Sequence, residues 1–187
     1  MRAIVLALLL ATPAVAQDAP PTSAALPAAL PVDVAEAILA RPDRFNDVAA
    51  NLIRAHGTDG GITPEAIETA IALDRAFFRA RALRPFLEAD LDADGTLASA
   101  EIAARASVLS APARARLMRQ QAEADRDSDG TISQAELRSF ADAQVDRASR
   151  PRDEALLRAV AAFDANADGR TDLAEVTSSL QAVAPAN

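Results

Sequence analysis

Three short stretches of this 187-residue chain place oxygen-bearing side chains at alternate positions and end in a glutamate. They read D-L-D-A-D-G-T-L-A-S-A-E at 90–101, D-R-D-S-D-G-T-I-S-Q-A-E at 125–136 and D-A-N-A-D-G-R-T-D-L-A-E at 164–175. Each holds four carboxylates, if Asp172 is counted in the last. Carboxylates crowded into one loop destabilise a fold unless a cation neutralises them. The stretches therefore predict sites for a hard cation with oxygen ligands.

The three stretches belong to a longer repeat. They begin 35 and 39 residues apart, and a weaker copy, A-H-G-T-D-G-G-I-T-P-E-A, begins 35 residues upstream at Ala55. Between loops lie 23–27 residues, enough for an outgoing helix, a short link and an incoming helix. Four helix–loop–helix units are therefore predicted, with Pro112 and Pro151 near the starts of two incoming helices. Pro85 lies within another incoming helix and predicts a late start or a kink there.

The composition predicts an all-α fold. Ala, Leu, Arg, Glu and Gln favour helix, β-branched residues are sparse, and only 3% of the chain is aromatic. Upstream of the repeats, a capping box at Asp33 and Glu36 predicts a first helix that ends at Arg41. Pro42 can open a second helix that runs to about Ala55.

Charge and composition exclude several functions. The chain carries 27 Asp and Glu against 19 basic residues, and phosphate backbones repel such a surface, so nucleic acid is not expected as a partner. It has no Cys, which excludes disulfides, thiol catalysis and zinc–thiolate sites. It holds neither a Ser/His/Asp set nor a phosphate-binding Gly loop, so an enzyme is not predicted.

The loops resemble those of the EF-hand calcium-binding family, and the resemblance extends over about residues 43–182. In that family, positions 1, 3 and 5 supply side-chain oxygens, position 7 its backbone carbonyl, and the Glu at position 12 both carboxylate oxygens. The resemblance implies about three Ca²⁺ per chain. The implied ligands are Asp90, Asp92, Asp94, Thr96 and Glu101; Asp125, Asp127, Asp129, Thr131, Ser133 and Glu136; and Asp164, Asn166, Asp168, Arg170, Asp172 and Glu175.

The resemblance also implies differences between the loops. At position 9, Ala98 offers no oxygen, Ser133 can hold a water, and Asp172 adds a carboxylate. The first loop, 55–66, keeps only Asp59 of the four side-chain ligands and is predicted to be a silent, structural unit.

In this family the position-8 residues of paired loops form a short β-bridge. Consecutive units are predicted to pair, so that residues 33–109 form one EF-hand pair and 110–187 the other. Ile62 is then expected to lie opposite Leu97, and Thr171 replaces the apolar residue in the last loop.

The N-terminal stretch has the three parts of a signal peptide. Arg2 is followed by a short apolar run and by the small-residue site A-V-A, which predicts a signal peptide over 1–16 that is cleaved between Ala16 and Gln17. The run is too short to span a bilayer, and no later segment approaches the roughly 20 residues required. An exported protein, periplasmic or secreted, is expected. Residues 17–32, rich in Pro and Ala, are predicted to be a disordered spacer.

EF-hand proteins either buffer calcium or open a hydrophobic groove for a target. Promiscuous sensors line that groove with Met, whereas Met118 is the single Met of the chain after residue 16. A monomeric calcium buffer or calcium-stabilised binding module is therefore expected, with a sensor for an unidentified partner protein as the alternative. A dockerin-like module is disfavoured by the incoming helices and the final Glu. A lanthanide-binding protein similar to the lanmodulins is disfavoured because the loops lack Pro at position 2 and lie farther apart.

Overall fold

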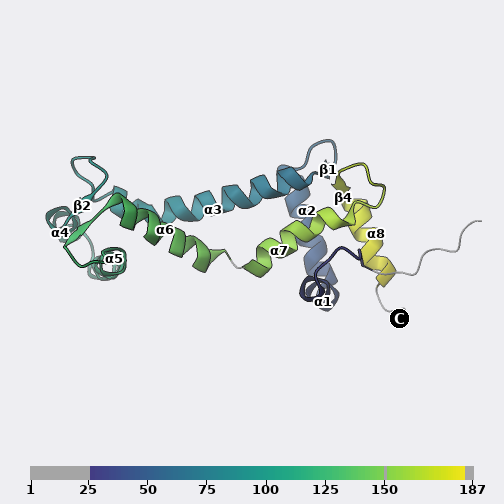
Figure 1. Cartoon of the computed structure of the whole chain (residues 1–187), viewed down its shortest axis with the longest axis horizontal. Coiled ribbons are helices and arrows are strands. Elements are labelled where there is room, and N and C mark those ends of the chain that lie inside the picture. The colour runs from purple at the N-terminus through teal and green to yellow at the C-terminus, as the bar shows by residue number, and fades with distance from the viewer. Residues whose placement is uncertain (1–25, 150, 184–187) are drawn as a thin grey trace, which may run out of the picture.

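The computed structural model describes residues 26–149 and 151–183, and these fold into eight α-helices, one 3₁₀ helix and four two-residue strands (Figure 1). In chain order the elements are α1 (Val32–Ala40), α2 (Pro42–His56), β1 (Gly61–Ile62), α3 (Pro64–Leu87), β2 (Leu97–Ala98), α4 (Ser99–Ser107), α5 (Ala111–Ala124), β3 (Thr131–Ile132), α6 (Gln134–Ala148), α7 (Pro151–Ala159), η1 (Val160–Phe163), β4 (Thr171–Asp172) and α8 (Leu173–Val183). The predicted all-α class is confirmed. The predicted signal peptide, 1–16, lies outside the described residues, as do residues 17–25 of the predicted spacer.

The molecule is elongated, with a cluster of short elements at each end (Figure 1). One end, which we call the terminal lobe, contains α1, α2, β1, β4 and α8. The other end, the central lobe, contains β2, α4, α5 and β3. The helices α3, α6 and α7 run between the two lobes, and α3 lies alongside α6.

The four short strands pair in a nested order. β2 and β3 form one antiparallel sheet, with Leu97 opposite Ile132. β1 and β4 form the other, with Ile62 opposite Thr171. The first unit therefore pairs with the fourth and the second with the third. The predicted pairing of consecutive units, and of Ile62 with Leu97, is wrong.

The continuous helix α3 explains this order. It is both the outgoing helix of the first unit and the incoming helix of the second, with no link between them. Its 24 residues span about 36 Å, which holds the first two loops at opposite ends of the molecule. Neither loop can reach the other, so each pairs with a later unit that the returning helices bring alongside. The predicted boundary between residues 109 and 110 consequently falls inside the central lobe.

Pro85 lies within α3 and does not delay its start. The helix begins at Pro64, where the Thr63 hydroxyl accepts a hydrogen bond from the Ala66 N–H at 3.2 Å. Proline removes one backbone donor and crowds the preceding turn, which is costly in a helix interior. Phe86, directly after it, is fully buried in the central lobe, so packing offsets part of that cost.

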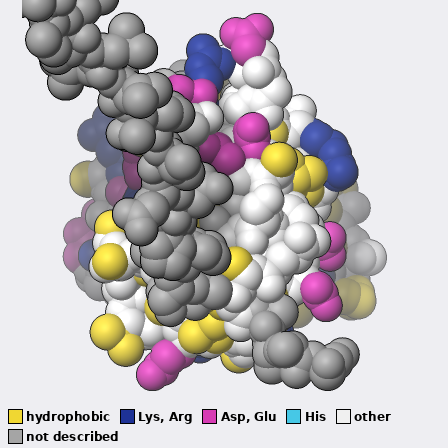
Figure 2. Space-filling model, turned by 90° about the vertical axis from the view of Figure 1, so that its right-hand side faces the viewer, with side chains coloured by type: hydrophobic (Ala, Val, Ile, Leu, Met, Phe, Trp, Pro, Cys, Tyr) yellow, Lys and Arg dark blue, Asp and Glu magenta, His cyan; other side chains and the backbone are white. Residues whose placement is uncertain are grey.

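The core of the terminal lobe joins the first and fourth units. Phe45 of α2 packs against Phe163 of η1, with ring centroids 5.2 Å apart. The helix α1 also enters this core through Val34 and Ile38, which are 2% and 0% exposed. Its N-terminus has no side-chain cap, so the predicted capping box does not form. On the end face shown in Figure 2, hydrophobic side chains are scattered in small groups among acidic ones.

Part of the predicted spacer belongs to this lobe. Leu26 and Leu30 pack against the terminal core, and the Leu30 N–H donates to the Pro27 carbonyl at 3.1 Å. The prediction of a disordered spacer is therefore wrong for residues 26–32, which form a turn and the first residue of α1.

The core of the central lobe joins the second and third units. Phe86 of α3 meets Phe140 of α6 nearly edge to face, with ring centroids 5.2 Å apart. Leu97 and Ile132, the paired strand residues, are each 1% exposed in the same core. Each lobe thus has an aromatic contact between paired units, in agreement with the nested order.

Ion pairs fasten α3 to the returning helix α7. Glu154 is buried on α7, and the Arg75 guanidinium donates to it at 2.8 Å and that of Arg158 at 3.3 Å. Arg158 also binds Glu68 at 2.6 Å. These donors, Arg75 foremost, hold the pKa of Glu154 below its usual range.

No helix within the described residues is both long and apolar enough to cross a membrane.

Candidate metal centre

The loop 90–101 uses its own backbone N–H groups to hold its carboxylates. Gly95 N–H donates to Asp90 Oδ2 at 3.1 Å, across a turn in which Gly95 has a φ of 80°. That positive φ suits glycine, which lacks a Cβ. The N–H and the hydroxyl of Thr96 both donate to Asp94 Oδ1 at 2.7 Å, and these bonds, the hydroxyl first, lower the pKa of Asp94.

Glu101 closes this loop from the first turn of α4. Its Oε1 accepts the Leu91 N–H at 2.8 Å, and its Oε2 accepts the Ala98 N–H at 2.9 Å. The bonds from Ala98 and then Leu91 lower the pKa of Glu101, because both stabilise the charged form. One ionised carboxylate therefore joins positions 2 and 9 of the loop.

The loop 125–136 has the same hydrogen-bond pattern. Gly130 N–H donates to Asp125 Oδ2 at 3.1 Å, and Thr131 N–H donates to Asp129 Oδ1 at 2.7 Å. Two loops that begin 35 residues apart in the sequence thus adopt the same structure.

Glu136 takes the closing position in this second loop. It accepts N–H groups from Arg126 at 2.8 Å and from Ser133 at 2.9 Å, and these bonds, Ser133 first, lower the pKa of Glu136. The Ser133 hydroxyl donates to Glu136 Oε2 at 2.9 Å and accepts the Glu136 N–H at 3.3 Å. Ser133 therefore caps α6 in a reciprocal capping box. The sequence predicted only that Ser133 can hold a water.

Both loops leave a buried oxygen without a partner. Asp90 Oδ1 and Asp125 Oδ1 are buried, and neither has a hydrogen-bond partner among the described residues. In each loop, oxygens of three carboxylates lie within 4.8 Å of one another: Asp90, Asp92 and Glu101 in one, and Asp125, Asp127 and Glu136 in the other. A buried polar atom without a partner and crowded like charges are both unfavourable. A cation bound among these oxygens relieves both, so the residues fit a hard ion such as Ca²⁺.

The loop 164–175 differs in its first half. Asp164 Oδ2 accepts the Gly169 N–H at 2.9 Å, and Asp164 Oδ1 accepts the Asp168 N–H at 3.2 Å, so both oxygens have partners. Position 3 holds the amide of Asn166, whose oxygen also accepts the Asp168 N–H, at 2.8 Å. Within the described part of the chain, this loop does not bring three carboxylates as close together as the other two do.

Asp172 and Glu175 form a reciprocal pair at the start of α8. Asp172 Oδ1 accepts the Glu175 N–H at 2.8 Å, and Glu175 Oε2 accepts the Asp172 N–H at 2.9 Å. Asp172 therefore caps this helix as Ser133 caps α6. Glu175 also accepts the Ala165 N–H at 3.0 Å, which reproduces the closure of the other loops.

The loop 55–66 is a tight hairpin and lacks the shape of the other three. Thr58 and Gly61 exchange both backbone hydrogen bonds, at 2.9 and 3.2 Å. The two residues between them, Asp59 and Gly60, have φ values of 53° and 85°, as an Asp-Gly type I′ turn requires. In the other loops the positive φ values fall at positions 4 and 6, with a residue between them.

Arg170 brings positive charge to this ligand-poor loop. Its Nη1 donates to the Thr58 carbonyl at 2.7 Å and to the Thr58 hydroxyl at 3.0 Å, and lies 3.5 Å from Asp59 Oδ2. The predicted role of Arg170 was its backbone carbonyl alone. The sequence did mark this side chain as different, because the other two acidic loops have Thr at position 7.

Two side chains connect the loops of the central lobe beyond the strand pair. The Ser99 hydroxyl donates to the Gly130 carbonyl at 2.5 Å, and Gln134 Nε2 donates to the Asp94 carbonyl at 3.4 Å. Both donors occupy position 10 of their loops and reach the opposite loop. Neither was predicted to have a role, although a polar residue at position 10 distinguishes this pair from the last loop, which has Leu173.

Comparison with known families agrees with this geometry. A family model described as EF hand matches residues 122–141, which cover the loop 125–136 and parts of α5 and α6. Neither the curated proteins nor the solved structures that were compared match the chain. The matched segment and the repeated helix–loop–helix fold both support the EF-hand family. The match and the two close carboxylate groups together indicate a calcium-binding protein.

Proposed function

We propose that the chain holds about three Ca²⁺, one in each of the loops 90–101, 125–136 and 164–175. The observation that carries this proposal is the pair of buried carboxylate oxygens, Asp90 Oδ1 and Asp125 Oδ1, that have no partner among the described residues. The side chains at positions 1, 3, 5 and 12 and the carbonyl at position 7 would hold each ion. The ion supplies positive charge, and the chain supplies hard oxygens that its own N–H groups already orient.

The loops differ in how ready they are for an ion. The central loops leave one oxygen of their first Asp free, whereas in the last loop Asp164 has both oxygens engaged by N–H groups. An ion in the last loop would share Asp164 Oδ1 with the Asp168 N–H, which leaves that oxygen less free to bind it. Affinity in the loop 164–175 is therefore expected to be the weakest of the three.

We further propose that the protein is an exported buffer or a calcium-stabilised module. The pattern of residues 1–16 supports export, and an extracellular setting suits dissociation constants on the order of 10⁻⁶ to 10⁻³ M. Sensors act by exposing an apolar face on loading. In the terminal lobe, α1 already covers such a face with Val34 and Ile38, which favours a static role. The acids of the loops serve as ligands in this account, so we propose no catalytic role.

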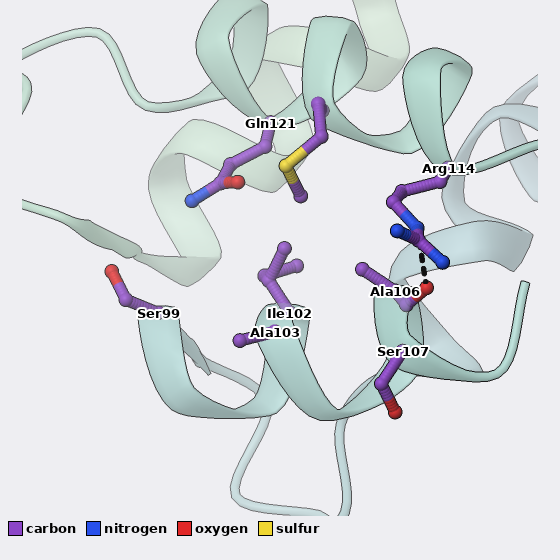
Figure 3. Close-up of a pocket in the computed structure, with 8 residues that line it drawn as sticks. Ser99, Ile102, Ala103, Ala106, Ser107, Arg114 and Gln121 are labelled. Atoms are coloured by element: carbon purple, nitrogen blue, oxygen red, sulfur yellow. Dashed lines mark hydrogen bonds between the residues drawn. The ribbon is translucent and has the colours of Figure 1, made fainter. Parts of the chain in front are cut away.

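A calcium sensor is the second candidate, and the central lobe favours it. A cleft of about 390 Å³ lies between α4 and α5, with Ile102 and Ala106 on one side and Gln121 on the other (Figure 3). Met118 lines it as well and is 38% exposed. A flexible Met at an apolar cleft is suited to a protein target.

Binding of a hydrophobic dye separates the two roles. A buffer should bind the same amount of dye in calcium and in chelator, whereas a sensor should bind more dye in calcium. If the central cleft is the surface that opens, Met118→Gln should remove the gain in dye binding. The control Leu39→Gln, which replaces an exposed leucine of α1, should leave that gain unchanged. A gain in dye binding that neither substitution alters would count against the buffer role and would place the surface that opens outside this cleft.

A further inference from the structure

A second concave surface lies on the terminal lobe, away from the loops. It is a groove of about 500 Å³ between α1, α2 and α7. Its apolar lining comes from all three helices, with Ala37, Phe45, Val48, Leu156 and Leu157 as the main contributors. Phe45 is buried at 3% exposure, and the other four are half-buried. The volume lies within the range of small-molecule sites, which are concave, mostly apolar and about 300–1,000 Å³ in size.

The rim of this groove is basic, although the protein is acidic. Arg41, Arg44 and Arg152 line it together with a single acid, Asp153, so the lining carries a net charge of +2. The whole chain has a net charge of −8. Among the residues that the structure describes, none of these three arginines forms an ion pair, while Arg75 and Arg79 of α3 and Arg158 of α7 do.

The placement of the arginines gives the groove a polarity. Arg41 lies between α1 and α2, Arg44 belongs to the first turn of α2, and both line the groove. Arg152 belongs to the first turn of α7, on another wall of the groove. Charge on two walls and an apolar floor match a molecule with one anionic end and one apolar end.

We propose that this groove binds an anionic amphiphile with a single apolar chain. The apolar part packs against Phe45, Val48 and Leu157, and the anionic head lies among the guanidinium groups of Arg41, Arg44 and Arg152. Arginine forms charge-assisted, often bidentate hydrogen bonds with carboxylate, sulfonate and phosphate oxygens. Asp153 disfavours a head with several negative charges.

The direct test is calorimetric titration of the full chain with sodium decanesulfonate below its micellar concentration. Decyltrimethylammonium, which has the same chain and a cationic head, and methanesulfonate, which has the head alone, serve as the comparison ligands. We expect saturable binding of one decanesulfonate per chain, with at least tenfold weaker binding of the other two. Binding of the cationic amphiphile with equal affinity, or no saturable binding of decanesulfonate, would overturn the proposal.

Charge-neutral substitutions locate the site. The double variant Arg41→Gln/Arg44→Gln should weaken decanesulfonate binding by about tenfold, since each arginine contributes a charge-assisted bond at a partly exposed position. The matched control, Arg119→Gln/Arg138→Gln, removes two exposed arginines of α5 and α6 and should leave the affinity unchanged. Equal weakening by both pairs would show a non-specific charge effect and refute the site. If the double variant fails to fold, Arg152→Gln gives the same comparison with one substitution.

Discussion

Removing the carboxylate of Glu101, a proposed calcium ligand, should weaken calcium binding in the loop 125–136 and leave the loop 164–175 unaffected. The substitution Glu101→Gln keeps the size of the side chain and removes the carboxylate that closes the loop 90–101. Its partner loop is set by the nested order of the strands, in which β2 pairs with β3. A pairing of consecutive units would instead couple this loop to the silent first loop, so the two orders give different results.

The expected size follows from the contacts between the two loops. Besides the strand pair, Ser99 donates to the Gly130 carbonyl at 2.5 Å and Gln134 to the Asp94 carbonyl at 3.4 Å. A hydrogen bond of this kind contributes about 1 kcal/mol net. If the loosened loop loses the shorter of the two, calcium binding in the loop 125–136 weakens by about fivefold, since 1.4 kcal/mol corresponds to tenfold.

Amide resonances can follow each loop separately. Gly95, Gly130 and Gly169 each donate a hydrogen bond to the first Asp of their own loop, at 3.1, 3.1 and 2.9 Å. Calcium titration of ¹⁵N-labelled protein therefore reports three occupancies in one experiment. In Glu101→Gln, we expect Gly95 to stop responding, Gly130 to respond at about fivefold higher calcium and Gly169 to respond as before.

The control for this experiment is Glu175→Gln, which removes the closing carboxylate of the last loop. It should abolish the response of Gly169 and leave Gly95 and Gly130 unchanged, because the last loop pairs with the ligand-poor first loop. If Glu101→Gln left the response of Gly130 unaltered, the nested order would be wrong.

Three further substitutions test single contacts. Glu154→Gln should lower the free energy of unfolding by about 1–2 kcal/mol at pH 7. Because Arg75 lowers the pKa of Glu154, this contribution is complete above the unfolded pKa of about 4.3 and is lost as pH falls through the lower folded pKa. Denaturant titrations below the folded pKa should therefore show no difference in stability between the variant and the unaltered chain. An equal loss of stability at pH 7 and at the low pH would exclude the ion pair as its cause. Arg170→Ala should destabilise the terminal lobe by about 1 kcal/mol through its lost bonds to Thr58 while the calcium stoichiometry in calorimetry stays the same, since the proposed ligand is its backbone carbonyl; a lost ion would show that the side chain is needed at the site. Thr171→Val should raise the melting temperature, because the Thr171 hydroxyl is buried without a partner among the described residues, and a lower melting temperature would show that it is satisfied after all.

The sequence predicted the elements whose chemistry is local. Acids at alternate positions, the glycine of each turn and the closing Glu all lie within twelve residues, and the structure brings three carboxylates together in two of the three loops. The helix from Pro42 to His56 was predicted within one residue, because a proline opens it and Gly57 follows it. The weak fourth copy at Ala55 was also recognised as different, and its backbone is a hairpin turn with positive φ at Asp59 and Gly60.

The sequence did not reveal which units pair, because the pairing depends on whether α3 continues through Pro85. Pro85 suggested an interruption, whereas α3 continues through it and holds the first two loops apart. Position-8 residues carry no mark of their partner, since Ile62 would fit Leu97 as well as Thr171. The contact of Arg170 with Thr58 follows from that pairing and could not be foreseen without it.

The packing of the N-terminal segment was missed for a related reason. Its high content of Pro and Ala resembles that of a spacer, yet Leu26, Leu30, Val34 and Ile38 recur at four-residue spacing and all contact the terminal core. That spacing is typical of one helix face. The signal was present, but the prolines between these residues obscured it.

The most direct test of the account is the number of calcium ions that the chain binds, measured by calorimetric titration of calcium-free protein. We expect three ions for the unaltered chain and two for Glu136→Gln. A count below two for the unaltered chain, or a count that Glu136→Gln does not lower, would contradict the assignment of these loops as calcium sites.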